Sequence, residues 1–94
     1  MSCGVVRTFH NNNNVKEEYF VINDKIFGEY KSYWYNGSLR EKCYYVNGKL
    51  HGESYYYYAN GLQREFGIFS NDKVIFYEDY IYDGYNAVQK FERK

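Results

Sequence analysis

Aromatic and β-branched residues form short runs along the chain, and Asn-Gly pairs separate these runs. The clearest case is segment 30–50, where two aromatic-rich runs are joined by Asn36-Gly37 and closed by Asn47-Gly48. Asn and Gly tolerate the positive φ that both central positions of a type I′ turn require. Asn-Gly between such runs therefore predicts a β-hairpin.

The hairpin pattern repeats along the sequence. Gly28-Glu29 recurs 24 positions later as Gly52-Glu53, and most of the chain follows the same offset. Each unit contains two turn signals, so strands are expected about every twelve residues, the spacing of a β-meander. The predicted units are 4–27, 28–51, 52–75 and a partial unit at 76–94. Aligned polar positions include Asn12, Asn36 and Asn60; Lys16, Arg40 and Arg64; and Glu17, Glu41 and Glu65.

The outer units depart from this pattern. In the first unit, residues 11–14 and Asn23-Asp24 replace the two Asn-Gly pairs, whereas the third unit keeps Asn60-Gly61 and changes the second pair to Asn71-Asp72. The last unit has an Asp83-Gly84 turn and then loses the alignment. Its tail is expected to form either a strand or a short capping helix, because atypical end units act as caps in repeat arrays.

Composition supports an all-β chain. Aromatic residues make up 23% of the 94 residues, with 14 Tyr and 7 Phe, and proline is absent. These aromatic residues suit a pleated, half-buried surface. A chain of this length is expected to form one domain, residues 1–94.

Charge gives little indication of a partner. Lys and Arg number 12, as do Asp and Glu, so no overall field favours nucleic acid or an anionic membrane. The amino terminus lacks the apolar stretch of a signal peptide. We therefore expect a cytoplasmic protein, in the host cytoplasm if the source is a virus, with Cys3 and Cys43 as reduced thiols.

The repeated motif resembles the MORN repeat, in the short variant found in bacterial proteins labelled as antitoxins and in large DNA viruses. The resemblance implies an elongated, single-layer antiparallel sheet that serves as a scaffold for protein contacts, with phospholipid as a second possible ligand class and no catalytic residues. It rests on Gly28, Tyr33, Tyr35, Asn36, Gly37, Leu39, Tyr45, Asn47, Gly48, Lys49, His51 and Gly52, then Tyr57, Asn60 and Gly61.

Charged residues form two aligned rows. Strict alternation along the strands would place the basic row on one face and the glutamates on the other. A two-residue loop at each first Asn-Gly would pair every basic residue with an aromatic ring, giving Phe9 with Lys16, Tyr33 with Arg40 and Tyr57 with Arg64. Such pairs favour a structural role for the basic row over a phosphate-binding stripe, although the two roles are compatible.

Surplus aromatic side chains are the candidates for binding a partner. The candidate residues are Tyr30, Trp34, Tyr35, Tyr55, Tyr56 and Tyr58. Alternation predicts Tyr35 and Tyr55 on one face and the other four on the opposite face. Exposed aromatic area of this kind marks partner sites.

No residue pattern indicates catalysis, a metal site or a cofactor. His10, Cys43 and His51 occupy positions that the other units fill mainly with packing residues such as Trp34, Tyr19 and Phe27. We therefore expect a non-catalytic scaffold that binds another protein or a second copy of itself. The alternatives are an antitoxin or inhibitor of a partner protein, and a module that binds phospholipid headgroups or carbohydrate.

Overall fold

The computed structural model describes the backbone of residues 3–83 and 86–93 and the side chains of residues 3–80. This part of the chain contains β-strands and no helix, so no membrane-spanning helix occurs in it. The strands are β1 (Cys3–Phe9), β2 (Val15–Ile22), β3 (Lys25–Tyr33), β4 (Leu39–Val46), β5 (Lys49–Leu50), β6 (Gly52–Tyr57), β7 (Gln63–Ser70), β8 (Lys73–Asp83) and β9 (Asn86–Arg93).

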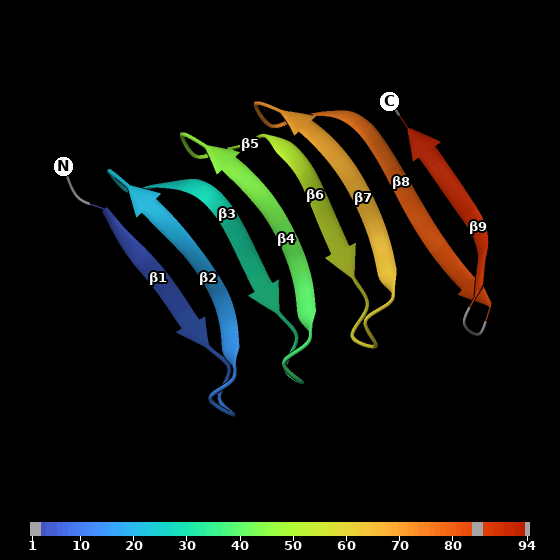
Figure 1. Cartoon of the computed structure of the whole chain (residues 1–94), viewed down its shortest axis with the longest axis horizontal. Coiled ribbons are helices and arrows are strands. Elements are labelled where there is room, and N and C mark those ends of the chain that lie inside the picture. Colours follow the sequence, from blue (N-terminus) through green and yellow to red (C-terminus); the bar gives the residue numbers. More distant parts are fainter. Residues whose placement is uncertain (1–2, 84–85, 94) are drawn as a thin grey trace.

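All the strands belong to one antiparallel sheet. Their order is β1-β2-β3-β4-β6-β7-β8-β9, and β5 pairs with β4 (Figure 1). The chain therefore crosses the sheet as a meander, and its tail forms strand β9 rather than a helix. This arrangement confirms the predicted all-β repeat meander.

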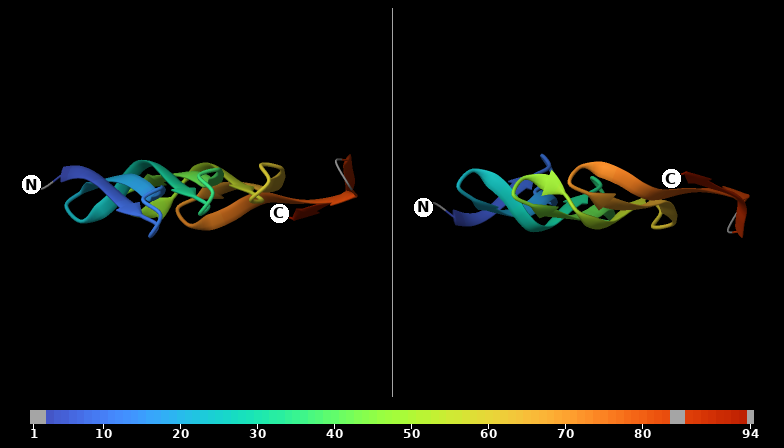
Figure 2. Two further views of the ribbon diagram at one scale, coloured as in Figure 1. Left: turned by 90° about the horizontal axis from the view of Figure 1, so that it is seen from below. Right: turned by 90° about the horizontal axis from the view of Figure 1, so that it is seen from above.

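The sheet is a single layer. Its Cα atoms span 48 × 36 × 12 Å, and the views from below and above show one thin, undulating ribbon (Figure 2). Among the described side chains, Cys43 is the only hydrophobic one that is buried, at 1% exposure. Two polar side chains, Ser32 and Glu78, are also buried. A hydrophobic core of the usual kind is thus missing from this part of the chain.

The turns that join β2 to β3, β4 to β5 and β7 to β8 have two residues each, and they lie at the upper ends of the strands in Figure 1. Asn47 and Gly48 both have positive φ, 52° and 78°, as a type I′ turn requires. Asn71 and Asp72 also have positive φ, 47° and 70°. Asp replaces Gly without changing the turn because Asp tolerates the left-handed conformation.

The loops at the lower ends are longer than the sequence predicts. The Trp34 N–H donates to the Ser38 carbonyl at 2.8 Å, and the Gly37 N–H donates to the Trp34 carbonyl at 2.9 Å. Gly37 has a φ of 91°, whereas Asn36 is not in the left-handed region and its Oδ1 accepts the Ser38 N–H at 2.9 Å. Such a three-residue loop with a left-handed glycine forms a G1 bulge. Asn36-Gly37 is therefore not the two-residue turn expected.

This longer loop shifts the pairing by one residue next to each lower loop. The predicted pairs Phe9–Lys16, Tyr33–Arg40 and Tyr57–Arg64 are wrong. Their place is taken by Phe9–Val15, Tyr33–Leu39 and Tyr57–Gln63. Beyond the shift the predicted register holds, and Ser32 lies opposite Glu41. Each basic residue is left as the extra residue of a β-bulge.

Glycines bend the strands near the upper turns. Strand β4 pairs with β5 close to the turn and with β6 farther along, and Gly52, which begins β6, has a φ of 96°. Gly28 in β3 has a φ of 90° at the equivalent position. The next unit carries Phe76 there, and its register shifts between Ile68 and Phe69.

Side chains tie each lower loop to the backbone of the next unit. The indole N–H of Trp34 donates to the Tyr57 carbonyl at 3.0 Å, and the Tyr58 hydroxyl donates to the Tyr80 carbonyl at 3.2 Å. Asn36 Nδ2 donates in the same way to the Ala59 carbonyl at 3.1 Å. These contacts, together with the strand ladders, stabilise a sheet in which almost none of the described side chains form a core.

Candidate functional site

Two arginines lie between aromatic rings on one face of the sheet. The Arg40 guanidinium carbon is 5.2 Å from the centre of the Trp34 ring and 5.7 Å from that of Tyr56. Arg64 is 5.1 Å from Tyr56 and 5.7 Å from Tyr58. We call these five residues the cation–π ladder, since each distance lies within the range of cation–π attraction.

The β-bulge explains why the arginines lie on this face. Tyr56 is directly opposite Glu41 and therefore projects from the same side of the sheet. Arg40 contacts this ring, and its Nε donates to the Tyr56 hydroxyl at 3.0 Å. Arg64 Nε lies 4.0 Å from a carboxylate oxygen of Glu65. The expectation that the arginines and glutamates occupy opposite faces is therefore wrong.

Three repeat-related glutamates cross the sheet beside the ladder. Glu17, Glu41 and Glu65 lie on β2, β4 and β7, and we call them the carboxylate row. Ser32 lies opposite both Glu17 and Glu41, and Tyr56 lies opposite both Glu41 and Glu65. Hydroxyl side chains thus alternate with carboxylates along one line.

Glu17 and Glu41 have different surroundings. The Tyr30 hydroxyl donates to Glu17 at 2.7 Å and the Thr8 hydroxyl at 3.0 Å, and the bond from Tyr30 is the main cause of the lowered pKa of Glu17. Glu41 has no hydrogen bond or ion pair to the described part of the chain. Its burial raises its pKa above the usual value, and the neighbouring Glu65 and Glu17 add to the increase.

Ser32 is an unusual residue between these two carboxylates. Its side chain is 3% exposed, and its Oγ has no hydrogen-bond partner in the described structure. A buried hydroxyl without a partner costs free energy, so Ser32 and Glu41 form a polar pair that is incompletely satisfied.

Tyrosines border the carboxylate row on the side away from the ladder. The Tyr30 ring lies 5.5 Å from that of Tyr19 and 6.0 Å from that of Tyr45. Cys43 is directly opposite Tyr30. Burial raises the pKa of the Cys43 thiol to about 12, so the thiol stays protonated and is a poor nucleophile.

The structure divides the six aromatic candidates between different surroundings. Trp34, Tyr56 and Tyr58 meet in the ladder, and Tyr30 lies on the same face. Tyr55 projects from the opposite face and packs on Phe66, with ring centres 5.2 Å apart. Tyr35 lies in a lower loop, 55% exposed, and touches the His10 ring.

The sequence predicts aromatic contacts for Arg40 and Arg64 but assigns them to Tyr33 and Tyr57 instead of to the rings of the ladder. The signal that could have found them is the repeated order of an aromatic, a loop and a basic residue. That order places Arg40 six residues after Trp34 and Arg64 six residues after Tyr58.

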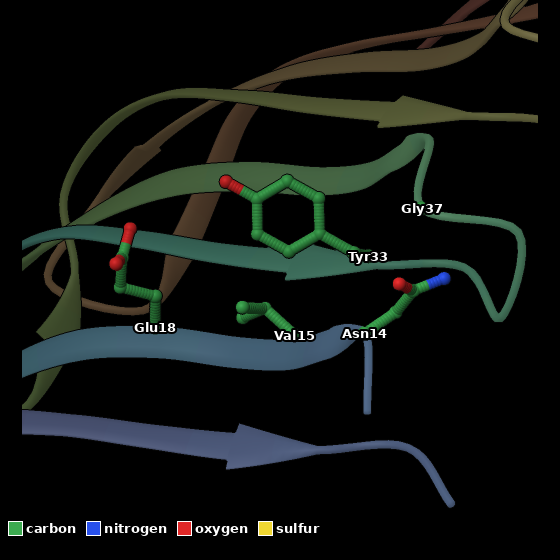
Figure 3. Close-up of a pocket in the computed structure, with 5 residues that line it drawn as sticks. All are labelled: Asn14, Val15, Glu18, Tyr33 and Gly37. Atoms are coloured by element: carbon green, nitrogen blue, oxygen red, sulfur yellow. The ribbon is translucent and has the colours of Figure 1, made fainter. Parts of the chain in front are cut away.

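The opposite face carries a small cleft near the first lower loops. It has a volume of about 240 Å³ and is lined by Asn14, Val15, Glu18, Tyr33 and Gly37 (Figure 3). Glu18 is already paired with Arg7, whose Nε lies 2.6 Å from its carboxylate. The cleft is smaller than most ligand pockets, and it gathers few of the candidate residues.

Metal-binding side chains are not grouped in the described region. No cluster of three or more His, Cys, Asp or Glu occurs there with a geometry that could hold a metal ion. His10 Nε2 instead lies 2.9 Å from the Tyr33 carbonyl, the position that the Trp34 indole takes in the next unit. The chemistry that this face supports is therefore aromatic, cationic and carboxylate contact.

Removal of the Arg40 side chain tests how much the cation–π ladder contributes to stability. Arg40→Ala is expected to lower the free energy of unfolding by about 0.5–1 kcal/mol, the worth of an exposed cation–π contact. Chemical denaturation measures the change. Lys16→Ala is the control, because Lys16 is the aligned cation and no ring contact involves it in the described structure. Equal losses in the two variants would contradict the stacking role of Arg40.

Glu41→Gln tests the strain in the carboxylate row. Burial raises the pKa of Glu41 in the folded state above its value in the unfolded chain. The folded state therefore becomes less stable as pH rises through these two pKa values. The variant should therefore melt a few degrees higher than the wild type at neutral pH, and the difference should vanish in acid. Thermal unfolding across pH measures this. Glu29→Gln should behave oppositely, since the hydrogen bond from Lys31 lowers the pKa of Glu29.

Comparison with known protein families gives a match over most of the chain. The family model described as MORN repeat variant matches residues 2–23, 28–47 and 50–66. No curated protein and no solved structure shows significant similarity to the chain.

Proposed function

Because the chain belongs to the MORN repeat family, whose all-β repeat fold is typically non-catalytic, we propose that it is a non-catalytic scaffold whose ladder face binds protein. The ladder face is the side of the sheet that carries the cation–π ladder and the carboxylate row. The partner is a second copy of the chain or a different protein.

The main support for this proposal is the ordered cation–π ladder on a single-layer sheet, formed by Trp34, Arg40, Tyr56, Arg64 and Tyr58. Trp, Tyr and Arg are the residue types that dominate binding energy at protein interfaces. Their stacking holds the side chains in place before a partner arrives, which reduces the entropy lost on binding. Because the aromatic rings already engage both arginines, a bound phosphate would have to compete with the ladder.

A pair of neighbouring substitutions tests which face binds. Ser54 lies opposite Gly67 on the ladder face, and Tyr55 is the next residue along β6 and projects from the other face. Ser54→Arg and Tyr55→Arg therefore add the same charge to opposite sides of one strand. Light scattering after size exclusion, over a wide range of protein concentration, measures self-association. Quantitative capture from cells that make the protein measures binding to other proteins.

We expect Ser54→Arg to abolish the association and Tyr55→Arg to leave it close to the wild-type level. Both variants must retain the wild-type circular dichroism spectrum for the comparison to count. Equal loss in both variants would contradict binding through the ladder face. A wild-type protein that stays monomeric and captures no protein would contradict the scaffold itself.

A further inference from the structure

We infer that the ladder face takes an extended polyproline-II segment of a partner protein that carries lysine at every third position, with the lysine ammonium groups on the carboxylate row. This inference rests on the proposed scaffold function and specifies the chemistry of its partner. It follows from the spacing of the row, from the unsatisfied groups in it and from the aromatic side chains on both sides.

Spacing is the first argument. Glu17, Glu41 and Glu65 lie on alternate strands of the sheet, because β3 separates the first two and β6 the last two. Neighbouring strands are about 4.8 Å apart, so successive carboxylates are about 9.6 Å apart across the sheet. A polyproline-II helix rises about 3.1 Å per residue with three residues per turn, and its third residues therefore recur on one side every 9.3 Å or so. The two repeats match closely.

The centre of the row provides the second argument. Ser32 projects between Glu17 and Glu41, and its buried Oγ lacks a hydrogen-bond partner. The Glu41 carboxylate accepts no hydrogen bond from the described residues, and the charge of Arg40 acts on it only at longer range. An ammonium group has three donors and no acceptor, so it suits a site that offers only oxygen acceptors. Two carboxylates and one hydroxyl supply such acceptors. A lysine here would satisfy the groups that the chain itself leaves unpaired.

Aromatic rings on both sides provide the third argument. Trp34 lies on the loop side of the row, Tyr56 lies within it between Glu41 and Glu65, and Tyr30 and Tyr45 lie on the other side. Lysine stems and proline rings pack on aromatic surfaces, and grooves that bind polyproline-II segments are commonly lined by aromatic residues. Arg64 lies within ion-pair distance of Glu65 and Glu17 accepts two hydrogen bonds, so Glu41 is the carboxylate of the row that is least engaged by the chain and most open to a cationic partner.

Synthetic peptides test the inference by their spacing. The probe is a capped peptide of three Lys-Pro-Pro triplets, and the comparison peptide has the same composition with the three lysines adjacent. Nuclear magnetic resonance titration of the isotope-labelled protein measures affinity and location. We expect saturable shifts at Glu17, Ser32 and Glu41, and roughly tenfold weaker binding of the clustered peptide. Equal affinity of the two peptides would overturn the spacing argument.

Variants of the protein test the site. Glu41→Gln and Ser32→Ala should each weaken binding of the periodic peptide several-fold, whereas Glu53→Gln, the same change on the opposite face, should leave it within a factor of about two. Ser32→Ala should also raise the melting temperature, because it removes a buried hydroxyl that lacks a partner. This rise shows that weaker binding is not a consequence of misfolding. Equal losses in Glu41→Gln and Glu53→Gln would reduce the effect to overall charge and overturn the site.

The two proposals fail separately. If Ser54→Arg abolishes association of the protein with its partner while the periodic peptide does not bind, the scaffold function stands and the lysine segment is excluded. If the peptide binds and shifts only residues of the opposite face, such as Tyr55 and Phe66, the inference about the ladder face is also overturned.

Discussion

Replacing Gly52 by valine is expected to lower the free energy of unfolding by about 2–3 kcal/mol, because a β-branched residue is strained at positive φ. Gly52 has a φ of 96°, and an added Cβ would come no closer than 4.0 Å to its nearest neighbour, Tyr44. The loss therefore comes from the backbone rather than from a clash. In a domain of this size it corresponds to a fall in melting temperature of roughly 10–20 °C.

Gly4 is the matched control for this substitution. It occupies the same position of the repeat as Gly52, yet its φ is not in the left-handed region and an added Cβ would meet nothing within 4 Å. Gly4→Val should therefore change the free energy of unfolding by less than about 0.5 kcal/mol. Thermal and urea unfolding of the two variants measure the difference. A Gly52→Val protein as stable as Gly4→Val would contradict the bend at residue 52.

Replacing Trp34 by alanine should cost about 2–3 kcal/mol of unfolding free energy, less than the loss of a fully buried tryptophan. The indole donates to the Tyr57 carbonyl, stacks on Arg40 and meets the Tyr56 ring edge-on at 6.4 Å. One side chain thus joins the second unit to the third. Urea denaturation measures the change.

Two further substitutions divide this loss into its parts. Trp34→Phe keeps an aromatic ring and removes the indole N–H, so it should cost about 1 kcal/mol, the net worth of a hydrogen bond. Tyr35→Ala, at the exposed neighbouring residue, should lie within about 0.5 kcal/mol of the wild type. If Tyr35→Ala were as damaging as Trp34→Ala, the contacts to the next unit would not be the source of the effect.

The sequence was sufficient to predict the meander because its signals are local. Asn47-Gly48 alone specifies a tight turn, and repetition of that signal every unit orders the strands along the sheet. The conformation of the lower loops could not be predicted in this way, because Asn36-Gly37 has the same two residues as Asn47-Gly48 but folds differently. The Asn36 side chain accepts the Ser38 N–H, so Asn36 avoids the left-handed conformation that a type I′ turn would demand.

This difference between the two kinds of turn determines which residues meet at the candidate site. One extra loop residue changes the register and carries Arg40 and Arg64 to the face of Tyr56, whereas strict alternation predicts the other face. The burial of Ser32 could not be predicted from the sequence either, because it depends on side chains from neighbouring strands. The composition of the site was therefore visible in the sequence, but its arrangement was not.

The bonds from each lower loop to the next unit have a consequence for how the sheet unfolds. Among the described strands, substantial contacts join only neighbours in the sheet, so each strand depends mainly on the two strands beside it. Stability in such a structure is a sum over adjacent pairs, and opening propagates from the ends inward. Trp34, bonded to the third unit, and Tyr58, bonded to the fourth, therefore act as the couplings that make separate hairpins unfold as one cooperative molecule.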